Sequence, residues 1–366
     1  MLAGQGKANP SLLASGLPGS TRLHACAHAC TLMYAQAPCA SYEGIQPKIS
    51  VMAIYCFENS STRDLARVGL AFMNTELTVG RPSALLRALL ASFRVAGIQR
   101  GSHLIDFIPL RLLGGEVIWA DTDAGPLVLR ISDTGTREFL IFGHPLADIE
   151  ETKIVRALLP TARGMLDIGA HYGWYTKLAM NLMYSQAPKV ALEANPEVAT
   201  CLARSVSGSS GVQVLNVAAT DRARRLPFYC ARGSGLSSAV REVGAPIVVA
   251  GMPVDEVWPA DRPLDFVKCD VEGGELDVLR GARRIRKVYE PIWMLEFDER
   301  FLAEARVDPD EVADEVFDLL CWWRSDKDGW VLADNLGAIV GEKRTRQNVF
   351  LVPSGRAIEF AQWMEH

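Results

Sequence analysis

The chain has 366 residues, of which 49% are hydrophobic and 22% charged, enough for one large domain with an extension or for two domains. A formal net charge of −5 gives no basic surface for nucleic acid, and no stretch has the roughly 18 consecutive apolar residues of a membrane span. We therefore expect neither a nucleic-acid partner nor a membrane span. Eight cysteines in a chain this long do not make a disulfide scaffold, so we expect a cytoplasmic protein.

Residues 1–50 differ in composition from the rest of the chain. They contain a single acidic residue, Glu43, and many alanines, serines, glycines and prolines, with little hydrophobic periodicity. Such a composition does not build a packed core, so we expect residues 1–78 to be a disordered leader. A transit peptide, or a leader added by placing the start of translation too early, would have the same composition.

A metal cluster is another interpretation of this segment, because it contains five possible ligands: His24, Cys26, His28, Cys30 and Cys39. Structural zinc sites pair two closely spaced ligands with a second, distant pair. The run lacks this spacing, so we do not predict a metal site there.

Residues 79–149 are expected to form a small extension of one helix and three strands. Pro82 suits the first turn of a helix, and five apolar residues recur on one helical face: Leu85, Leu86, Leu89, Leu90 and Phe93. Short apolar runs at 117–119, 127–131 and 138–142 are separated by turn residues such as Asp133 and Gly135, which predicts strands. The extension could pack on the main domain or cover a ligand site, and we favour simple packing.

Residues 150–366 alternate between strand-like and helix-like patterns. Strands are expected at 165–168, 190–193, 212–218, 264–269, 292–297, 330–333 and 349–352. Helices are expected at 174–184, 196–208 and 274–287, and a further helix begins at Asp308 and turns five apolar side chains inward: Val312, Val316, Leu319, Leu320 and Trp323. This alternation predicts an α/β fold with a doubly wound, mostly parallel sheet, whose ligands bind at the carboxyl ends of the strands.

The first chemical motif, Asp167-Ile-Gly-Ala-His-Tyr-Gly173, begins in the first of these strands and continues beyond its end. Its two glycines, Gly169 and Gly173, let the backbone approach a ligand and let the next helix pack against the sheet. Glu193 ends the following strand, 20 residues beyond Gly173, where a carboxylate can accept hydrogen bonds from both hydroxyls of a ribose. The motif and Glu193 together predict a cofactor that contains a nucleoside.

Two features of this motif favour S-adenosylmethionine (SAM) over a dinucleotide. The dinucleotide fingerprint requires G-x-G-x-x-G, and here His171 takes the place of the middle glycine. Asp167 would repel phosphates, whereas it suits the ammonium and sulfonium groups of SAM. Asp167 could instead merely cap the turn, but its occurrence together with the glycines and Glu193 favours cofactor binding.

The second motif is Asp265-Phe-Val-Lys-Cys-Asp-Val-Glu-Gly-Gly-Glu275, in which a buried strand delivers three acids to its carboxyl end: Asp270, Glu272 and Glu275. Buried acids are costly unless they have partners, so acids beside a ligand cleft indicate function. Glu272 and Glu275 could instead favour the N-terminus of the next helix. For Asp270 we favour a functional role.

Three shorter stretches accompany the two motifs: Glu193-Ala-Asn-Pro196, Val217-Ala-Ala-Thr-Asp221 and Val278-Leu-Arg-Gly-Ala282. With the two motifs they resemble the FkbM-type methyltransferases. The resemblance covers roughly residues 150–353, and its most specific part is the run of acids and glycines at 270–275 followed by Leu-Arg-Gly-Ala.

The resemblance implies a class I methyltransferase fold with a Rossmann-like sheet of seven strands. It also implies SAM as the donor of a methyl group to a hydroxyl of a sugar, glycolipid or polyketide. The residues that it implies for donor binding are Asp167, Gly169, Ala170, His171, Gly173, Glu193, Asn195 and Asp221. His171 stands where family members commonly carry asparagine, so it either replaces a hydrogen bond to the donor or adds a titrating group near the methyl.

Transfer to an alcohol requires a base for the hydroxyl proton. The candidate catalytic residues are Asp270, His171 and Glu296, with His144 of the extension as a further candidate. Neighbouring strands lie about 4.8 Å apart, so Asp270 and Glu296 are expected to face one cleft. They could act without metal or hold a Mg²⁺ ion that binds the acceptor, and we favour the metal-free arrangement. Ser237 and Ser238 either line the acceptor pocket or belong to a flexible loop.

Two other functions fit parts of the sequence. A nucleotide-binding module without chemistry would keep the fold and bind the cofactor, and a nicotinamide-dependent oxidoreductase would use the same acid, Glu193. The identity of the small-molecule or glycan acceptor depends on loops that the sequence does not place, and the oligomeric state is also open.

Deletion of residues 1–50 is expected to change neither the melting temperature nor the affinity for S-adenosylhomocysteine, because their composition does not order a core. Thermal unfolding and calorimetry of the full and shortened chains measure both quantities. Loss of soluble expression on deletion would contradict this expectation and would reopen the five cysteines and histidines as a structural site.

Overall fold

The computed structural model describes residues 77–95, 110–133, 135–209, 211–230, 239, 246–325, 329–340 and 347–364. All of these residues belong to one compact unit of the chain. The expected leader, except for its last two residues, lies outside the described residues, as do its possible metal ligands and the two serines at 237 and 238.

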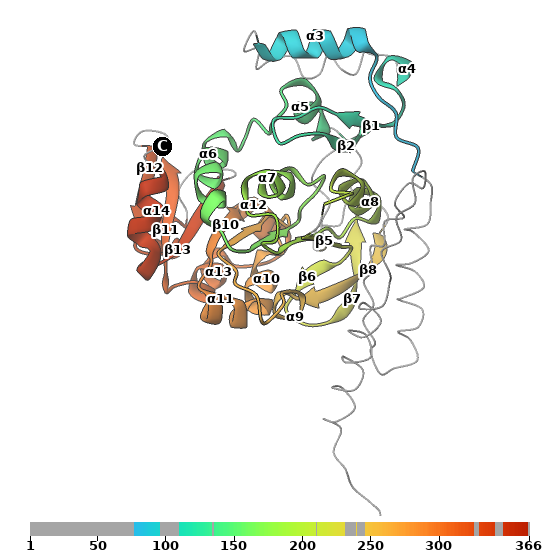
Figure 1. Ribbon diagram of the computed structural model, residues 1–366. Coiled ribbons are helices and arrows are strands. Elements are labelled where there is room, and N and C mark those ends of the chain that lie inside the picture. Colours follow the sequence, from blue (N-terminus) through green and yellow to red (C-terminus); the bar gives the residue numbers. More distant parts are fainter. Residues whose placement is uncertain are drawn as a thin grey trace, which may run out of the picture. The chain divides into compact units, whose positions relative to one another are not determined.

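A sheet of eight strands, in the order β5-β4-β3-β9-β10-β13-β11-β12, lies at the centre of the fold (Figure 1). Five strands are parallel: β5 (Val212–Leu215), β4 (Lys189–Leu192), β3 (Met165–Ile168), β9 (Phe266–Cys269) and β10 (Ile292–Phe297). Three pair antiparallel: β13 (Gln347–Pro353), β11 (Leu319–Ser325) and β12 (Gly329–Ala333). The expected doubly wound, mostly parallel sheet is confirmed. Its expected count of seven strands is one too few, because residues expected in the helix that begins at Asp308 form β11 instead, between β13 and β12.

Successive side chains of the strands pack into two buried clusters, one on each face of the sheet. On one face, Met165 and Phe266 pack with residues of four helices: α6 (Ile149–Leu158), α7 (Trp174–Leu182), α8 (Pro196–Ser205) and α14 (Ala357–Met364). On the other, Leu166 and Val267 pack with residues of five: α9 (Val254–Val257), α10 (Glu275–Gly281), α11 (Arg283–Tyr289), α12 (Glu299–Glu304) and α13 (Pro309–Glu315). Burial on both faces explains why these strands are almost continuously apolar.

A smaller sheet of three strands follows β5: β6 (Ala218–Thr220), β7 (Arg224–Tyr229) and β8 (Pro246–Pro253). The single strand expected at 212–218 is therefore wrong, since it is divided between two sheets. The division falls at Asn216, whose side-chain amide donates to the carbonyl oxygens of Glu193 and Ala194 at 2.8 and 2.9 Å. The Asn216 side chain thus contacts the backbone just after β4, at the point where β5 ends.

Two expected helices are also wrong in extent. The helix expected at 274–287 is two helices, α10 and α11, which meet at Ala282 with φ −113° and ψ 16°. Gly281 packs so closely there that a β-carbon would lie 2.1 Å from the carbonyl oxygen of Thr220. The helix that begins at Asp308 ends at Glu315, and Leu319, Leu320 and Trp323 belong to strand β11. Periodicity alone does not separate a short buried strand from a helix.

The extension consists of α3 (Ala84–Val95), α4 (Leu110–Leu113), β1 (Val117–Ala120), β2 (Leu127–Arg130) and α5 (Thr136–Ile141). The strand expected at 138–142 is wrong. Asp133 and Thr136 form a turn there, in which the Thr136 hydroxyl donates to the Asp133 carbonyl at 2.6 Å, and the apolar run continues as helix α5. The apolar face expected on α3 is only half buried, because Leu86 and Leu90 face the core while Leu85 is 83% exposed.

The extension shares its core with the main domain. Leu127 and Leu129 of β2 belong to the same buried cluster as Leu178 of α7. Backbone and side chains also join the two parts, since the Val128 N–H donates to Ser205 Oγ at 2.8 Å. Short 3₁₀ turns complete the described elements at Leu159–Thr161, Leu336–Ile339 and Ser354–Arg356. Within the described residues, none of the helices combines the length and hydrophobicity that a membrane span requires.

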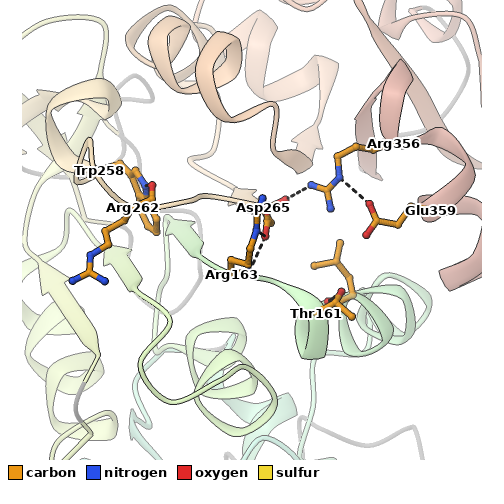
Figure 2. Close-up of polar contacts among 8 residues, drawn as sticks. Thr161, Arg163, Trp258, Arg262, Asp265, Arg356 and Glu359 are labelled. Carbon is orange, nitrogen blue, oxygen red and sulfur yellow. Dashed lines mark hydrogen bonds and ion pairs between the residues drawn. The ribbon is translucent and has the colours of Figure 1, made fainter.

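Asp265 joins the amino ends of β3 and β9, at the edge of the sheet opposite the carboxyl ends of these strands (Figure 2). Its carboxylate accepts from the backbone N–H of Arg163 at 2.8 Å and from the guanidinium at 2.9 and 2.7 Å. Arg356 donates to the Asp265 carbonyl at 3.0 Å and to Glu359 at 3.0 Å. Burial raises the pKa of Asp265, but the hydrogen bonds and charge of Arg163 outweigh burial, so the pKa is lowered.

Asp265→Asn is expected to lower the free energy of unfolding by about 1–2 kcal/mol at neutral pH, since it weakens a charge-assisted bond to a partly exposed arginine. The lowered pKa means that this stability is present above the unfolded pKa of about 3.9 and is lost as the pH falls through the folded pKa. Urea unfolding should therefore show a difference between the two proteins that shrinks toward about pH 3. The matched control is Asp261→Asn, whose side chain is 84% exposed, and it should have no effect. A difference for Asp265→Asn that stays constant with pH would contradict this account.

Candidate functional site

The register of the parallel strands brings the two sequence motifs to one edge of the sheet. Ile168 of β3 pairs with Leu192 of β4 and with Cys269 of β9. The residues that follow these three positions open loops at the same edge: Gly169, Glu193 and Asp270. The sheet therefore aligns a glycine loop and two acids that are more than 100 residues apart in sequence at their extremes.

A cavity of about 1020 Å³ lies over this edge. Its lining includes six of the residues expected in the site: Gly169, Ala170, His171, Glu193, Asn195 and Asp270. It also includes Val217, Ala218 and Ala219, which follow β5. Five other expected residues are not among the lining residues: Asp167, Gly173, Asp221, Glu296 and His144.

The glycine loop has a backbone that restricts its residues. Gly169 has φ 69°, and a β-carbon on it would lie 1.8 Å from the carbonyl oxygen of Asp270, so the loops after β3 and β9 touch there. Gly173 has φ 89°, and a β-carbon would lie 2.3 Å from Leu202, so this glycine serves the packing of α7 against α8. His171 has φ 52°, a left-handed conformation in which asparagine, aspartate and histidine are enriched. The backbone therefore accommodates either His171 or the asparagine of the family.

Glu193 joins the glycine loop to the loop after β4. Its carboxylate accepts from the backbone N–H of His171 at 2.8 Å and from that of Asn195 at 2.8 Å. Burial raises the pKa of Glu193, and the charge of His171 and these backbone hydrogen bonds partly offset the rise. The two loops are held in place by the acid that the sequence assigns to the ribose.

Lys268 is a buried ammonium between two carboxylates. Its Nζ lies 3.3 Å from Asp270 Oδ2 and donates to the carbonyl oxygen of Gly169 at 2.9 Å. Burial lowers the pKa of Lys268, but the charges of Asp270 and Asp167 outweigh burial and raise it. Asp167 pairs with Lys268 across the strands and accepts from the Thr176 hydroxyl at 2.5 Å. Asp167 is therefore positioned to balance the charge of Lys268 rather than to line the cavity.

The acids after β9 and β10 form a second group. Asp270, Glu272 and Glu296 each offer a carboxylate oxygen, and these oxygens lie within 4.8 Å of one another. Three hard oxygen donors fit a divalent cation, although the Lys268 ammonium beside Asp270 opposes one. Glu275 accepts from the backbone N–H groups of Val271 and Gly273 at 3.2 and 3.3 Å, and burial raises its pKa to about 7.

The extension forms a wall of the cavity, which the sequence analysis did not favour. Asp133 contacts the glycine loop, since its Oδ2 lies 3.1 Å from His171 Nε2. Arg130 lies 3.1 Å from Glu116 and 3.4 Å from Glu197 of α8. These side chains line the cavity together with Glu138 and Asp148 of the extension.

Tyr175 of α7 is another lining residue that the sequence analysis missed. Its hydroxyl donates to Asp148 Oδ2 at 3.2 Å, and Asn348 of β13 donates to Asp148 Oδ1 at 3.0 Å. Asp133, Asp148 and Tyr175 come from separate elements, and no spacing in the sequence connects them. The turn formed by Asp133 was the one available signal, and it was interpreted only as a turn.

Three expected site residues, Asp221, His144 and Glu296, lie outside the lining of the cavity. Asp221 pairs with Arg224 at 3.1 Å and with Arg222 at 3.4 Å. His144 Nδ1 lies 2.9 Å from Asp123 Oδ2. Glu296 is 1% exposed and stands opposite Asn348 in the sheet. The structure thus gathers the glycine loop, Glu193, Asn195 and Asp270 at the cavity and leaves these three residues outside its lining.

Residues 167–321 match the family model of the methyltransferase FkbM domain. No curated protein matches the sequence significantly. Among solved structures, the FkbM methyltransferase from Methylobacillus flagellatus KT is 15% identical with a TM-score of 0.34, and the similarity covers 51% of this chain and 43% of that one. The chain therefore spans less than half of that relative's length.

Two further structures are similar at the same distance. An O-methyltransferase of tomaymycin synthesis from Streptomyces achromogenes, in complex with SAM, is 14% identical with a TM-score of 0.34, covering 61% of this chain and 88% of that one. An O-methyltransferase from Bacillus cereus, in complex with S-adenosylhomocysteine, is 12% identical with a TM-score of 0.33, covering 79% of this chain and 99% of that one.

The matched segment contains the loops after β3, β4 and β9 that meet at the cavity. It begins at Asp167 in β3, includes Glu193 and Asp270, and ends at Cys321 in β11. Both sequence motifs lie inside the matched segment, each in a strand of the sheet and the loop that follows it. Residues 167–321 therefore resemble the methyltransferase FkbM domain.

Proposed function

We propose that the protein transfers the methyl group of SAM to a hydroxyl of a small molecule or glycan. The observation that carries the proposal is the meeting of the glycine loop, Glu193 and Asp270 at the edge of one cavity in an FkbM domain. At about 1020 Å³ the cavity is at the upper end of the usual range for small-molecule sites, about 300–1,000 Å³, which favours a donor and an acceptor bound together.

The donor would lie along the loops after β3, β4 and β5. Glu193 is fixed by two backbone amides, and its remaining lone pairs suit the hydroxyls of the ribose. The small side chains of Ala218 and Ala219 leave room for a flat base beside it. His171 and Asn195 complete this end of the cavity, and Asp167 would act from behind through Lys268.

Glu193→Ala is expected to remove most of the rise in melting temperature that S-adenosylhomocysteine causes in the wild type, because a ligand stabilises the native state in proportion to its affinity. Calorimetric titration below the melting temperature of the variant measures affinity separately from stability. This control matters because Glu193 also holds two loop amides. Unchanged affinity in a folded variant would show that the ribose lies elsewhere.

Methyl transfer to an alcohol is an in-line displacement. A bond forms between the acceptor oxygen and the methyl carbon, the carbon–sulfur bond breaks, and its electron pair stays on sulfur to give S-adenosylhomocysteine. Positioning the three atoms in line can supply on the order of 7–11 kcal/mol of the barrier reduction. The acceptor's hydroxyl proton must pass to a base, and Asp270 is our choice because it lines the cavity at the carboxyl end of β9.

Lys268 and His171 would shape this proton transfer. The Lys268 ammonium, 3.3 Å from Asp270, holds the carboxylate in place. His171, which Asp133 orients from the extension, is the second candidate base. Glu296 would contribute through its charge beside Asp270 rather than by contact with the acceptor.

Asp270→Asn is expected to reduce turnover at least about a hundredfold while donor binding survives, because the amide cannot accept the proton. Turnover of methyl-labelled SAM with an extract of the source cells measures the first, and calorimetry measures the second. A fully active Asp270→Asn enzyme would rule out both the base and the metal arrangement.

Chelation decides whether the acids act as a base or as metal ligands. We expect EDTA to leave activity unchanged, because Lys268 already balances the charge of Asp270. Activity that disappears with EDTA and returns with Mg²⁺ would instead assign Asp270, Glu272 and Glu296 to a cation that binds the acceptor hydroxyl.

A further inference from the structure

The lining of the cavity is strongly acidic. Among the described lining residues there are eight aspartates and glutamates, against Arg130, Lys268 and His171. Four of the acids come from the extension: Glu116, Asp133, Glu138 and Asp148. The donor carries two positive groups and one carboxylate, so it neutralises only a small part of this excess.

Each basic group of the described lining already faces a carboxylate. Arg130 lies between Glu116 and Glu197, Lys268 contacts Asp270, and His171 contacts Asp133. A phosphate or carboxylate on the acceptor would therefore have to displace an existing ion pair and would enter a negative field. A protonated amine would instead be attracted, since it adds a positive charge to a lining in which acidic residues outnumber basic ones.

Glu138 is the clearest example on the extension side. Its Oε2 accepts from the backbone N–H of Leu146 at 2.7 Å, which orients the carboxylate without neutralising its charge. It lines the cavity with Phe139 of the same helix, α5. An ammonium group and an apolar ring edge could both be accommodated on this wall.

We propose that the acceptor is a hydroxylated amine, of which an amino sugar is the simplest form. The amine is held by the acidic wall of the extension, and the neighbouring hydroxyl takes the methyl. The inference rests on the proposed function, because it names the acceptor of that same cavity. It also gives the extension a role in substrate selection, beyond the packing that its sequence predicts.

The test uses three sugars of the same ring size and different charge. Equilibrium dialysis of the full chain, saturated with S-adenosylhomocysteine, is carried out with labelled glucosamine, N-acetylglucosamine and glucuronate at a pH that keeps the amine protonated. Glucosamine is expected to bind at least tenfold more tightly than N-acetylglucosamine, with no measurable binding of glucuronate, and added salt should weaken glucosamine alone. Equal binding of the three, preference for glucuronate, or no binding of glucosamine overturns the proposal.

A matched pair of variants separates charge from packing. Glu138→Gln keeps the shape and the acceptor for Leu146, and it should weaken glucosamine binding at least threefold without changing that of N-acetylglucosamine. Glu256→Gln removes an exposed carboxylate on α9, outside the lining, and should change neither. Equal weakening of both sugars by Glu138→Gln would overturn the electrostatic role. Failure of S-adenosylhomocysteine to bind, measured beforehand, would count against the proposed function and not against this selectivity.

Discussion

The ammonium of Lys268 holds the two motif loops of this protein together. It donates to the carbonyl of Gly169, in the loop after β3, and pairs with Asp270, in the loop after β9. A buried charge is tolerated only when such partners surround it, and the carboxylate of Asp167 supplies part of the balance from the adjacent strand. One side chain, Lys268, therefore sets the relative positions of the glycine loop and of Asp270, the candidate base.

The strands next to the motifs could be predicted from sequence because they are buried on both faces and their apolar runs end in glycines and acids. The same reasoning predicted that Glu193, Asn195 and Asp270 lie together, and all three line the cavity. It failed where a short apolar run had no distinctive period, as at 138–142, which is helix α5, and at 319–325, which is strand β11. Such runs are assigned by tertiary packing, which a single sequence does not contain.

The site residues that escaped prediction share a cause. Asp133 contacts His171 across 38 positions of sequence, and Asp148 meets Asn348 across 200. Each is an ordinary polar residue in its own segment, and only the packing of the extension over the sheet gives it a partner in the cavity. Motif position predicts that Asp167 and Asp221 contact the donor, and in the structure their side chains contact Thr176 and Arg224.

The left-handed backbone at His171 limits how this loop can change over evolutionary time. Most side chains would strain the loop at φ 52°, so exchange at this position is confined to a few residue types. Asparagine and histidine are both among them, and a change between the two adds or removes an imidazole without rebuilding the fold. Proteins with this loop could thus acquire a protonatable ring beside Glu193 in very few mutational steps, provided that an acid such as Asp133 was already present to orient it.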